Sequence, residues 1–223
     1  MKRMCVAGLI MLAANALAGA AAAADLGARY PQPYVKAPLY TPPFSWTGFY
    51  LGLNGGGGWG SSTWDRTGSF DLSGGVIGGT AGFNWQTGPA VFGLEGDMDW
   101  SGASGTTVAG CAAGCTTKND WLGTARGRAG YAFDRFLPYI TGGLAFGDIR
   151  ASTPGFAGAS QTNLGWTIGA GVEAAIVGNW SAKAEYLHVD LGSFNCGLSC
   201  GPTATDNVSL REELLRGGVN YRF

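Results

Sequence analysis

Alternating apolar and polar residues divide the chain into eight runs, and this pattern predicts eight β-strands. The predicted strands cover roughly residues 47–60, 72–86, 90–100, 120–131, 137–149, 162–175, 180–191 and 208–223. Each run is close to or above the about 9–11 residues that a tilted strand needs to cross a membrane. Short turns at residues 87–89, 132–136 and 176–179 alternate with long polar gaps at residues 61–71, 101–119, 150–161 and 192–207. This alternation predicts an up-and-down antiparallel arrangement, with both chain ends on the side of the short turns.

The two faces of each run differ in character. In the third run, one face carries Phe92 and Leu94, whereas the other carries Glu95. The fourth, sixth and seventh runs repeat this contrast. A soluble barrel would bury its bulky side chains, but the polar face here is glycine and charge, too small and too polar for a hydrophobic core. The pattern therefore predicts an all-β, eight-stranded antiparallel transmembrane β-barrel with its apolar face toward lipid. A soluble β-sandwich is the alternative.

Aromatic residues near the ends of the runs fit two girdles at the membrane interfaces. They are Phe49, Trp59, Trp85, Trp100, Trp121, Tyr131, Trp180, Tyr221 and Phe223. In the last run, Val219, Tyr221 and Phe223 share one face. An aromatic residue at the end of such a strand resembles the signal by which bacterial outer-membrane proteins are recognised for insertion, so we expect these three residues to serve that signal.

The beginning of the chain has the pattern of a cleaved secretory signal. Lys2 and Arg3 precede an apolar run over residues 6–18, and small residues at 20–24 fit a cleavage site. The apolar run is shorter than the about 20 residues of a membrane-spanning helix. We therefore expect a signal peptide at residues 1–24, with an uncleaved helical anchor as the alternative.

Residues 25–46 are rich in proline, which resists both helix formation and strand pairing. We interpret this segment as an extended periplasmic linker that leads into a barrel at residues 47–223. A disordered tail without a role is the alternative.

The charged residues on the polar face are predicted to point into the barrel. Eight strands enclose a space just wide enough for side chains, in which unpaired ions would be costly to desolvate. We therefore expect a paired lumen network of Glu95, Asp97, Asp99, Arg126, Arg128, Glu173, Lys183, Glu185, Arg216 and Arg222. Such a network favours a plugged lumen, and a gated or narrow ion path is the alternative.

Composition restricts the function further. Without Lys2 and Arg3, 12 of the 14 basic residues remain against 15 acidic ones, a formal net charge of −3. No basic patch indicates nucleic-acid binding. Glycine accounts for 40 of the 223 residues, which suits a narrow barrel with close backbone approach.

Four cysteines remain after the signal, in two pairs with three residues between the partners. Both pairs fall in gaps predicted to be external loops, where the oxidising envelope favours disulfides. We expect Cys111 to pair with Cys115 and Cys196 with Cys200, although four cysteines permit three connectivities. A metal site of four thiolates is the alternative, but zinc spacings are tighter and no histidine lies near either pair.

Candidate catalytic residues are few, because His188 is the only histidine. It shares a face with Asp190 near the end of the seventh run, but no serine follows at matching parity. We interpret His188 as a polar residue at the membrane interface and expect no enzymatic activity.

Three segments together resemble the small outer-membrane β-barrel proteins of alphaproteobacteria, a family often called porin-like. They are residues 45–53 followed by a glycine run, residues 78–86, and Glu185-Tyr186-Leu187 with Asp190-Leu191-Gly192. The family includes major surface antigens and haem-binding proteins. The resemblance covers about residues 46–223 and implies an architecture like the OmpA membrane domain. It does not imply a shared ligand, since members differ chiefly in their external loops.

These observations predict a monomer in the outer membrane of a Gram-negative bacterium, with both termini periplasmic and a role in envelope structure and surface interaction. The expected partners are outer-membrane lipid, lipopolysaccharide and the barrel-insertion machinery; no cofactor and no metal are expected. A narrow channel for small solutes is one alternative. Binding of haem or a host surface through Trp64, Phe156 and the disulfide loops is another.

Overall fold

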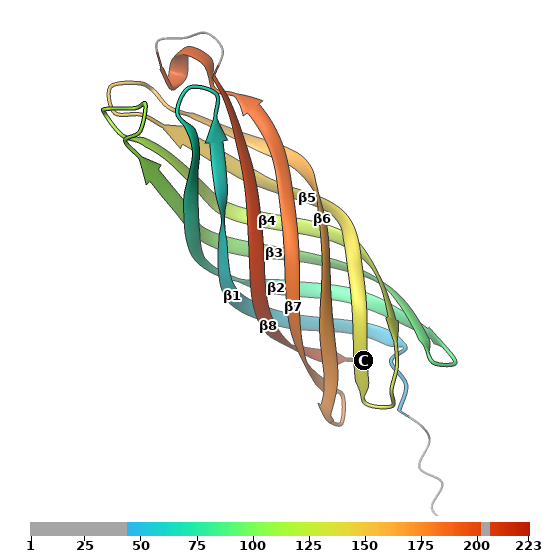
Figure 1. Cartoon of the computed structure of the whole chain (residues 1–223). Helices are drawn as coiled ribbons and strands as arrows, with labels where there is room; N and C mark the ends of the chain where they lie inside the picture. The colour runs from blue at the N-terminus through green and yellow to red at the C-terminus, as the bar shows by residue number, and fades with distance from the viewer. Residues whose placement is uncertain (1–43, 202–205) are drawn as a thin grey trace, which may run out of the picture. The chain divides into compact units, whose positions relative to one another are not determined.

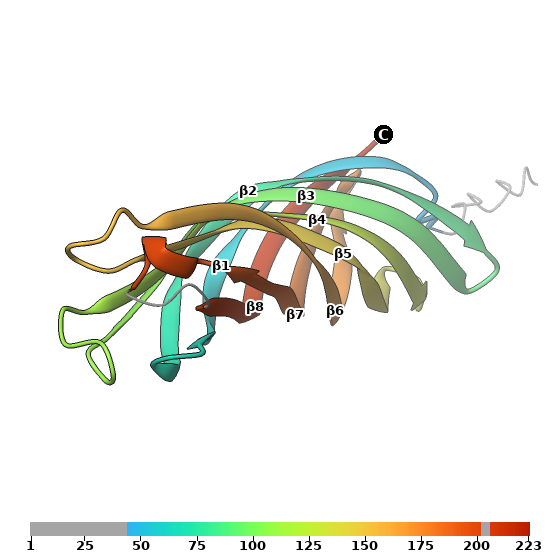
Figure 2. The same ribbon diagram turned by 90° about the horizontal axis from the view of Figure 1, so that it is seen from above.

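Eight antiparallel strands close into one barrel in the computed structural model of the chain, which describes residues 44–201 and 206–223. Each strand pairs with its neighbours in sequence, and β1 pairs with β8 to close the sheet (Figures 1 and 2). The predicted fold class is thereby confirmed. The predicted signal peptide and most of the predicted linker lie outside the described residues. In the described ranges, no helix has the length and hydropathy needed to cross a membrane.

The strands are longer than the sequence pattern predicts. They are β1 (Gly48–Trp64), β2 (Gly68–Thr87), β3 (Ala90–Thr107), β4 (Cys115–Tyr131), β5 (Phe136–Ser152), β6 (Ala159–Val177), β7 (Trp180–Asn195) and β8 (Asn207–Arg222). The three predicted short turns are present, but the four long gaps shrink to residues 65–67, 108–114, 153–158 and 196–206. Polar residues there continue the ladders because a strand that extends into water has no need of an apolar face. We call the end of the barrel with the three short turns the turn end, and the opposite end the loop end.

The strands are staggered around the barrel. A line of cross-strand partners that starts at Phe49 returns to β1 at Trp59, so positions 49 and 59 are offset by ten residues. Such a stagger requires the strands to tilt by about 40° to the axis. Figure 1 shows that the strands run obliquely around the barrel. The ten residues of β1 between these positions are about 34 Å long. At this tilt they rise about 26 Å along the barrel axis, close to the height of about 25 Å of the apolar band of outer-membrane barrels.

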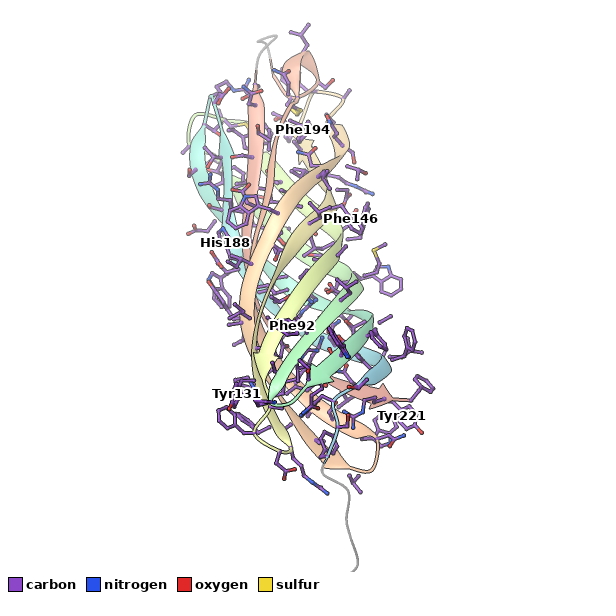
Figure 3. The ribbon with its side chains drawn as sticks, turned by 90° about the vertical axis from the view of Figure 1, so that its right-hand side faces the viewer. Phe92, Tyr131, Phe146, His188, Phe194 and Tyr221 are labelled. Carbon is purple, nitrogen blue, oxygen red and sulfur yellow. A yellow bond between two sulfur atoms is a disulfide. The ribbon has the colours of Figure 1, made fainter. Side chains whose placement is uncertain are left out.

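Aromatic side chains lie at the two edges of this band. Figure 3 shows Tyr131 and Tyr221 near the turn end, with Phe146 farther toward the loop end. The outward aromatic residues toward the turn end include Phe49, Trp85, Phe92, Tyr131, Phe136, Trp180, Tyr221 and Phe223. Those at the other edge are Trp59, Trp100, Trp121, Phe146 and Trp166. Between the edges, exposed side chains such as Leu53, Ile140 and Ile168 give the barrel wall an apolar surface.

The interior of the barrel has two halves of different chemistry. Toward the turn end it contains charged side chains, as the parity of the runs predicts. Toward the loop end it contains an apolar cluster, which corrects the prediction of a wholly polar inward face. The cluster includes Leu72, Val76, Leu122, Ile149, Leu187, Val189, Leu191, Val208, Leu210 and Leu214. The prediction was wrong because it extended the parity of the turn half to the whole barrel and assigned other members of the cluster, such as Trp64 and Phe194, to loops.

Inward-facing glycines bring the backbone of one strand against the next. A Cβ atom added to Gly143 would lie 2.2 Å from the carbonyl oxygen of Ala125 and 2.7 Å from the Cα of Arg126. By contrast, the nearest atom to a Cβ on outward-facing Gly127 would be 4.0 Å away. The two glycines lie in adjacent strands. Comparing their alanine variants therefore distinguishes the cost of a steric clash from the general effect of replacing a glycine.

We expect Gly143→Ala to lower the free energy of unfolding by about 1–3 kcal/mol, because the backbone of β4 must shift to admit a methyl group. Gly127→Ala should leave it unchanged or raise it slightly. The measurement is urea unfolding of the refolded protein in lipid vesicles, followed by tryptophan fluorescence. Equal effects of the two substitutions would contradict the close approach at Gly143.

Candidate functional site

Arg126 on β4 lies at the centre of the charged half of the lumen. Its Nη2 atom donates to Glu95 Oε1 at 2.6 Å and to Asp97 Oδ2 at 2.7 Å, both on the neighbouring β3. Its Nη1 atom lies 3.1 Å from Glu185 Oε1 on β7, across the barrel. Three carboxylates from two strands therefore surround one guanidinium group and compensate its charge.

Arg216 on β8 makes a second centre that shares two of these carboxylates. Its Nη2 atom lies 2.9 Å from Asp97 Oδ2 and 2.9 Å from Glu185 Oε1. Its Nη1 atom also forms an ion pair with Asp99. Since β8 closes the barrel against β1, these pairs connect the last strand with β3 and β7 through the lumen.

Two further cations complete the network toward the turn end. Lys183 Nζ donates to Glu95 Oε2 at 3.0 Å, and Arg128 Nη2 donates to Glu173 Oε2 at 2.9 Å. The Arg128 guanidinium also lies over the ring of Tyr139, 4.0 Å from its centroid. In all, Arg126, Arg128, Lys183 and Arg216 face Glu95, Asp97, Asp99, Glu173 and Glu185. Each of these nine residues is at most 6% exposed.

Neutral residues that the sequence reasoning missed donate further hydrogen bonds to the carboxylates of the network. Tyr50 donates its hydroxyl to Glu95 at 2.7 Å, and Tyr139 donates to Glu185 at 3.0 Å. Ser181 and Asn220 both donate to Glu173. Tyr50 could have been found from the alternation of residues along β1, because this alternation places its aromatic side chain on the inward face.

Arg222 does not join the charged network, although it was predicted to do so. Among the described residues it forms no ion pair, and its guanidinium lies 4.4 Å from the ring centroid of Phe44 and 5.5 Å from that of Trp46. Trp46 is fully buried and donates its indole N–H to the carbonyl oxygen of Asp134 at 3.0 Å. The chain therefore enters the barrel beneath the turn end, and Arg222 packs on that entry segment instead of on a carboxylate.

Above the network, the apolar cluster closes the loop half of the lumen. Leu122, Leu187 and Leu214 are fully buried there. Trp64 is also fully buried and donates its indole N–H to Thr117 Oγ1 at 2.9 Å. Trp64 therefore cannot form the ligand contact predicted for it, whereas Phe156 is exposed.

The connections at the loop end pack together into one cap. The structure joins Cys111 to Cys115 and Cys196 to Cys200, so the four sulfur atoms are not free to bind a metal as thiolates. Arg66, between β1 and β2, donates to the carbonyl oxygen of Cys200 at 3.1 Å. From the β5–β6 connection, Gly158 donates its backbone N–H to the carbonyl oxygen of Ser199 at 2.8 Å. Two connections are thus linked directly to the η1 segment (Gly197–Ser199) or to Cys200, and Arg66 also donates to Cys115 Sγ at the start of β4.

His188 points outward at the loop-side edge of the apolar band (Figure 3). Its Nδ1 atom lies 2.6 Å from Glu213 Oε1, and its ring centroid lies 5.2 Å from that of Trp166. Asp190 forms an ion pair with Arg211, with 2.8 Å between Oδ2 and Nε. In the part of the chain that the structure describes, no three His, Cys, Asp or Glu side chains come together as a metal site.

The predicted insertion-signal residues lie on the outer face of β8 at the turn end. Val219, Tyr221 and Phe223 are 45%, 36% and 70% exposed. The ring of Tyr221 packs edge-on against both Trp180 and Phe223. Their role in insertion stays a prediction.

The family model and the known proteins that match the chain all describe outer-membrane proteins. The family model described as outer membrane protein beta-barrel domain matches residues 5–223. The chain is 38% identical over 235 residues to the 31 kDa outer-membrane immunogenic protein of Brucella melitensis, with 92% of this chain and 95% of that protein covered. It is 32% identical over 216 residues to the 25 kDa outer-membrane immunogenic protein of Brucella abortus, with 96% and 97% covered.

Two other similarities are more distant or shorter. The chain is 39% identical over 166 residues to the 22 kDa outer membrane protein of Rhizobium leguminosarum, with 74% of each covered. Among solved structures, Neisserial surface protein A is 19% identical, with a TM-score of 0.46 and coverage of 79% of this chain and 98% of that one.

Substitution of the two arginines of β8 distinguishes the stability that comes from the ion-pair network from the stability that comes from side-chain packing. We expect Arg216→Met to lower the free energy of unfolding by about 3–5 kcal/mol, because it leaves buried carboxylates uncompensated. Arg222→Met loses only cation–π contacts, for which about 1 kcal/mol is expected. Thermal unfolding of both variants, read from the gel mobility of heated and unheated samples, compares them. Similar losses would show that the ion pairs add nothing beyond side-chain packing.

The disulfides should stabilise the cap and not the barrel. Closing so short a loop contributes at most about 2 kcal/mol in the chain-entropy account. We expect the quadruple Cys→Ser variant at positions 111, 115, 196 and 200 to refold into a heat-modifiable barrel that is cleaved faster by protease within residues 108–114 and 196–206. Mass spectrometry of the fragments locates the cleavage. Unchanged cleavage rates would mean that Arg66 and the backbone contacts suffice to order the cap.

Proposed function

The chain belongs to the outer membrane protein beta-barrel family and is thus an outer-membrane protein of a Gram-negative bacterium; on that premise we propose that it is a non-conducting, non-enzymatic barrel that supports the envelope and presents a rigid surface to the outside. The filling of its lumen carries this proposal.

Two successive barriers occupy the lumen. The charged network connects β3, β4, β6, β7 and β8 through side chains with little exposure. An ion that entered would have to separate pairs such as Arg126 and Glu185, and desolvation makes this costly. Beyond the network it would meet Leu122, Leu187 and Leu214, which offer no ligand to replace its water. This arrangement supports mechanical closure and argues against the narrow-channel alternative.

We place the loop end outside the cell and the turn end, with both described chain ends, in the periplasm. Outer-membrane barrels generally have short periplasmic turns and longer extracellular loops. The disulfides of the loop end are compatible with this placement, since they persist at the cell surface as they do in the periplasm.

The cap supports the surface part of the proposal. Exposed apolar side chains occur on three of its connections: Val108 is 71%, Phe156 42% and Leu198 66% exposed. Disulfides and the Arg66 contact hold the surrounding backbone, so these side chains are presented at little entropic cost to a partner. The buried position of Trp64 removes one residue from the haem or host-surface hypothesis, and no other observation favours haem.

An enzymatic function receives no support from the outward polar cluster. His188 is oriented by Glu213, as a general base would be, but Asp190 stands two residues away and is held by Arg211. No hydroxyl or thiol nucleophile contacts the His188 ring among the described residues. We therefore propose that this cluster serves the membrane interface.

Single-channel recording in planar bilayers tests the closed lumen. We expect the refolded protein to be electrically silent, and the isosteric variant Glu185→Gln to be silent as well, because the apolar half remains closed. Gel mobility before and after heating verifies folding of both proteins. Discrete openings whose size changes in Glu185→Gln would establish the channel alternative and sink the proposal.

Epitope tagging tests the orientation. A short tag inserted after Gly155, in the β5–β6 connection, should be bound by antibody on intact cells. The same tag after Gly178, in the turn between β6 and β7, should be bound only after the outer membrane is permeabilised. The reverse pattern would invert the proposed topology.

A further inference from the structure

A hollow opens on the outer wall of β1, β2 and β3, beside the loop-side edge of the apolar band. Its volume is about 370 Å³, at the lower end of the about 300–1,000 Å³ of small-molecule pockets. Trp59, Asp71, Ser73 and Ser104 line it with exposed, outward-facing side chains. The ladders pair Trp59 with Ser73 and Ser73 with Ser104, so these three residues lie on adjacent strands about 5 Å apart. Asp71 follows on the same face of β2, two positions from Ser73.

The polar groups of the hollow differ from the hydroxyl groups around them. The neighbouring outward hydroxyl groups bond each other, Thr63 with Ser69 at 2.6 Å and Thr106 with Thr116 at 3.0 Å. By contrast, the carboxylate and the two serine hydroxyl groups of the hollow form no side-chain hydrogen bond or ion pair with the described residues. One acceptor and two groups that both donate and accept are therefore available to a ligand.

The indole ring of Trp59 is the apolar wall of the hollow. It is 50% exposed and packs on no other aromatic ring in the described part of the chain, whereas Trp121 and Trp166 at the same edge pack on Phe146 and His188. A sugar ring has a face of weakly positive C–H groups, which suits the negative face of an indole ring. The hydroxyl groups of the same sugar need both acceptors and donors, and the carboxylate and the serines provide them.

The charges around the hollow argue against a charged ligand. Among the described residues, Asp71 is the only ionisable side chain that lines it. The ladders place Lys118 beside Ser104 and Glu213 beside Trp59, one charge of each sign. The surroundings thus have no positive surplus that would attract a phosphate or a carboxylate. A cation would find a single carboxylate and leave the donor capacity of the serines unused, whereas a neutral sugar uses all four side chains.

We propose that Trp59, Asp71, Ser73 and Ser104 bind a neutral sugar, with one face of its ring on the indole and its hydroxyl groups on the carboxylate and the serines. The head group of a membrane glycolipid and a soluble glycan share this chemistry. A hexose has about twelve non-hydrogen atoms, and at the usual binding energy per atom of small ligands we expect a dissociation constant on the order of 1 mM. The inference goes beyond the closed lumen and the cap, since no residue of either takes part.

Saturation-transfer NMR of the refolded protein in polyoxyethylene micelles, which carry neither sugar nor charge, tests the site. The probes are the methyl glycosides of glucose, galactose and mannose, with choline and inorganic phosphate as charged probes. We expect at least one methyl glycoside to receive saturation through the C–H groups of its ring. Trp59→Ala should weaken its binding about tenfold, because the aromatic face is lost, and Trp59→Phe should retain part of the affinity.

Trp100→Ala is the matched control. Trp100 lies at the same edge and is 73% exposed, but its ladder neighbours are Ile77 and Trp121 instead of polar residues. This variant should bind the sugar as the unsubstituted protein does, and gel mobility before and after heating verifies the folding of each variant. The absence of a sugar signal, or a signal that survives unchanged in Trp59→Ala, would overturn the proposal. Preferential binding of choline or phosphate would overturn it as well.

A glycolipid probe distinguishes the two sources of the sugar. A diacylglycerol that carries the best-bound sugar is added to the micelles, and its affinity is compared with that of the methyl glycoside. Tighter binding that depends on Trp59 supports a lipid head group, whereas equal affinity supports a soluble glycan. Single-channel recording does not involve the hollow, so failure of the sugar titration leaves the closed-lumen proposal standing.

Discussion

The narrow lumen is the constraint on which the structure depends. Closing eight strands leaves an interior that side chains alone must fill, so each inward residue is limited by those opposite it. Large groups such as Arg216 can be accommodated because glycines on other strands, Gly56 and Gly143 among them, leave room beside them. The abundance of glycine is therefore a consequence of volume, and the positions of the glycines are determined by the large inward side chains.

The same constraint explains the division of the interior. In a charged layer each carboxylate needs a partner within reach, and Arg126 and Arg216 provide this by sharing Asp97 and Glu185. Such a shared arrangement cannot continue indefinitely, since every further ion adds a desolvation penalty. Toward the loop end, leucine and valine fill most of the lumen at no such cost, with the buried Glu212 side chain among them. Polar connectivity near the chain ends and apolar packing near the cap thus stabilise one barrel in two ways.

The fold could be predicted from the sequence because the period of two is a local signal that each strand repeats. The inward position of the charges followed from the same parity. Their partners did not, because the link between Arg216 on β8 and Asp97 on β3 depends on stagger and lumen width, which no local pattern contains. Strand ends were also missed: Trp64 and Phe194 lie in segments that look like polar loops, yet both side chains are buried inside the barrel. Glu213 as the partner of His188 required the register of β7 and β8.

The cap joins segments that are far apart in the chain. Arg66 touches Cys200, 134 positions later, and Gly158 is bonded to Ser199. An antibody that recognises this surface therefore binds a conformational epitope composed of several connections. A linear peptide copied from one connection lacks the neighbours that shape it. Sequence drift in any one connection is restrained as well, because a substitution at Gly201 would displace the Arg66 side chain on which the other connections rest.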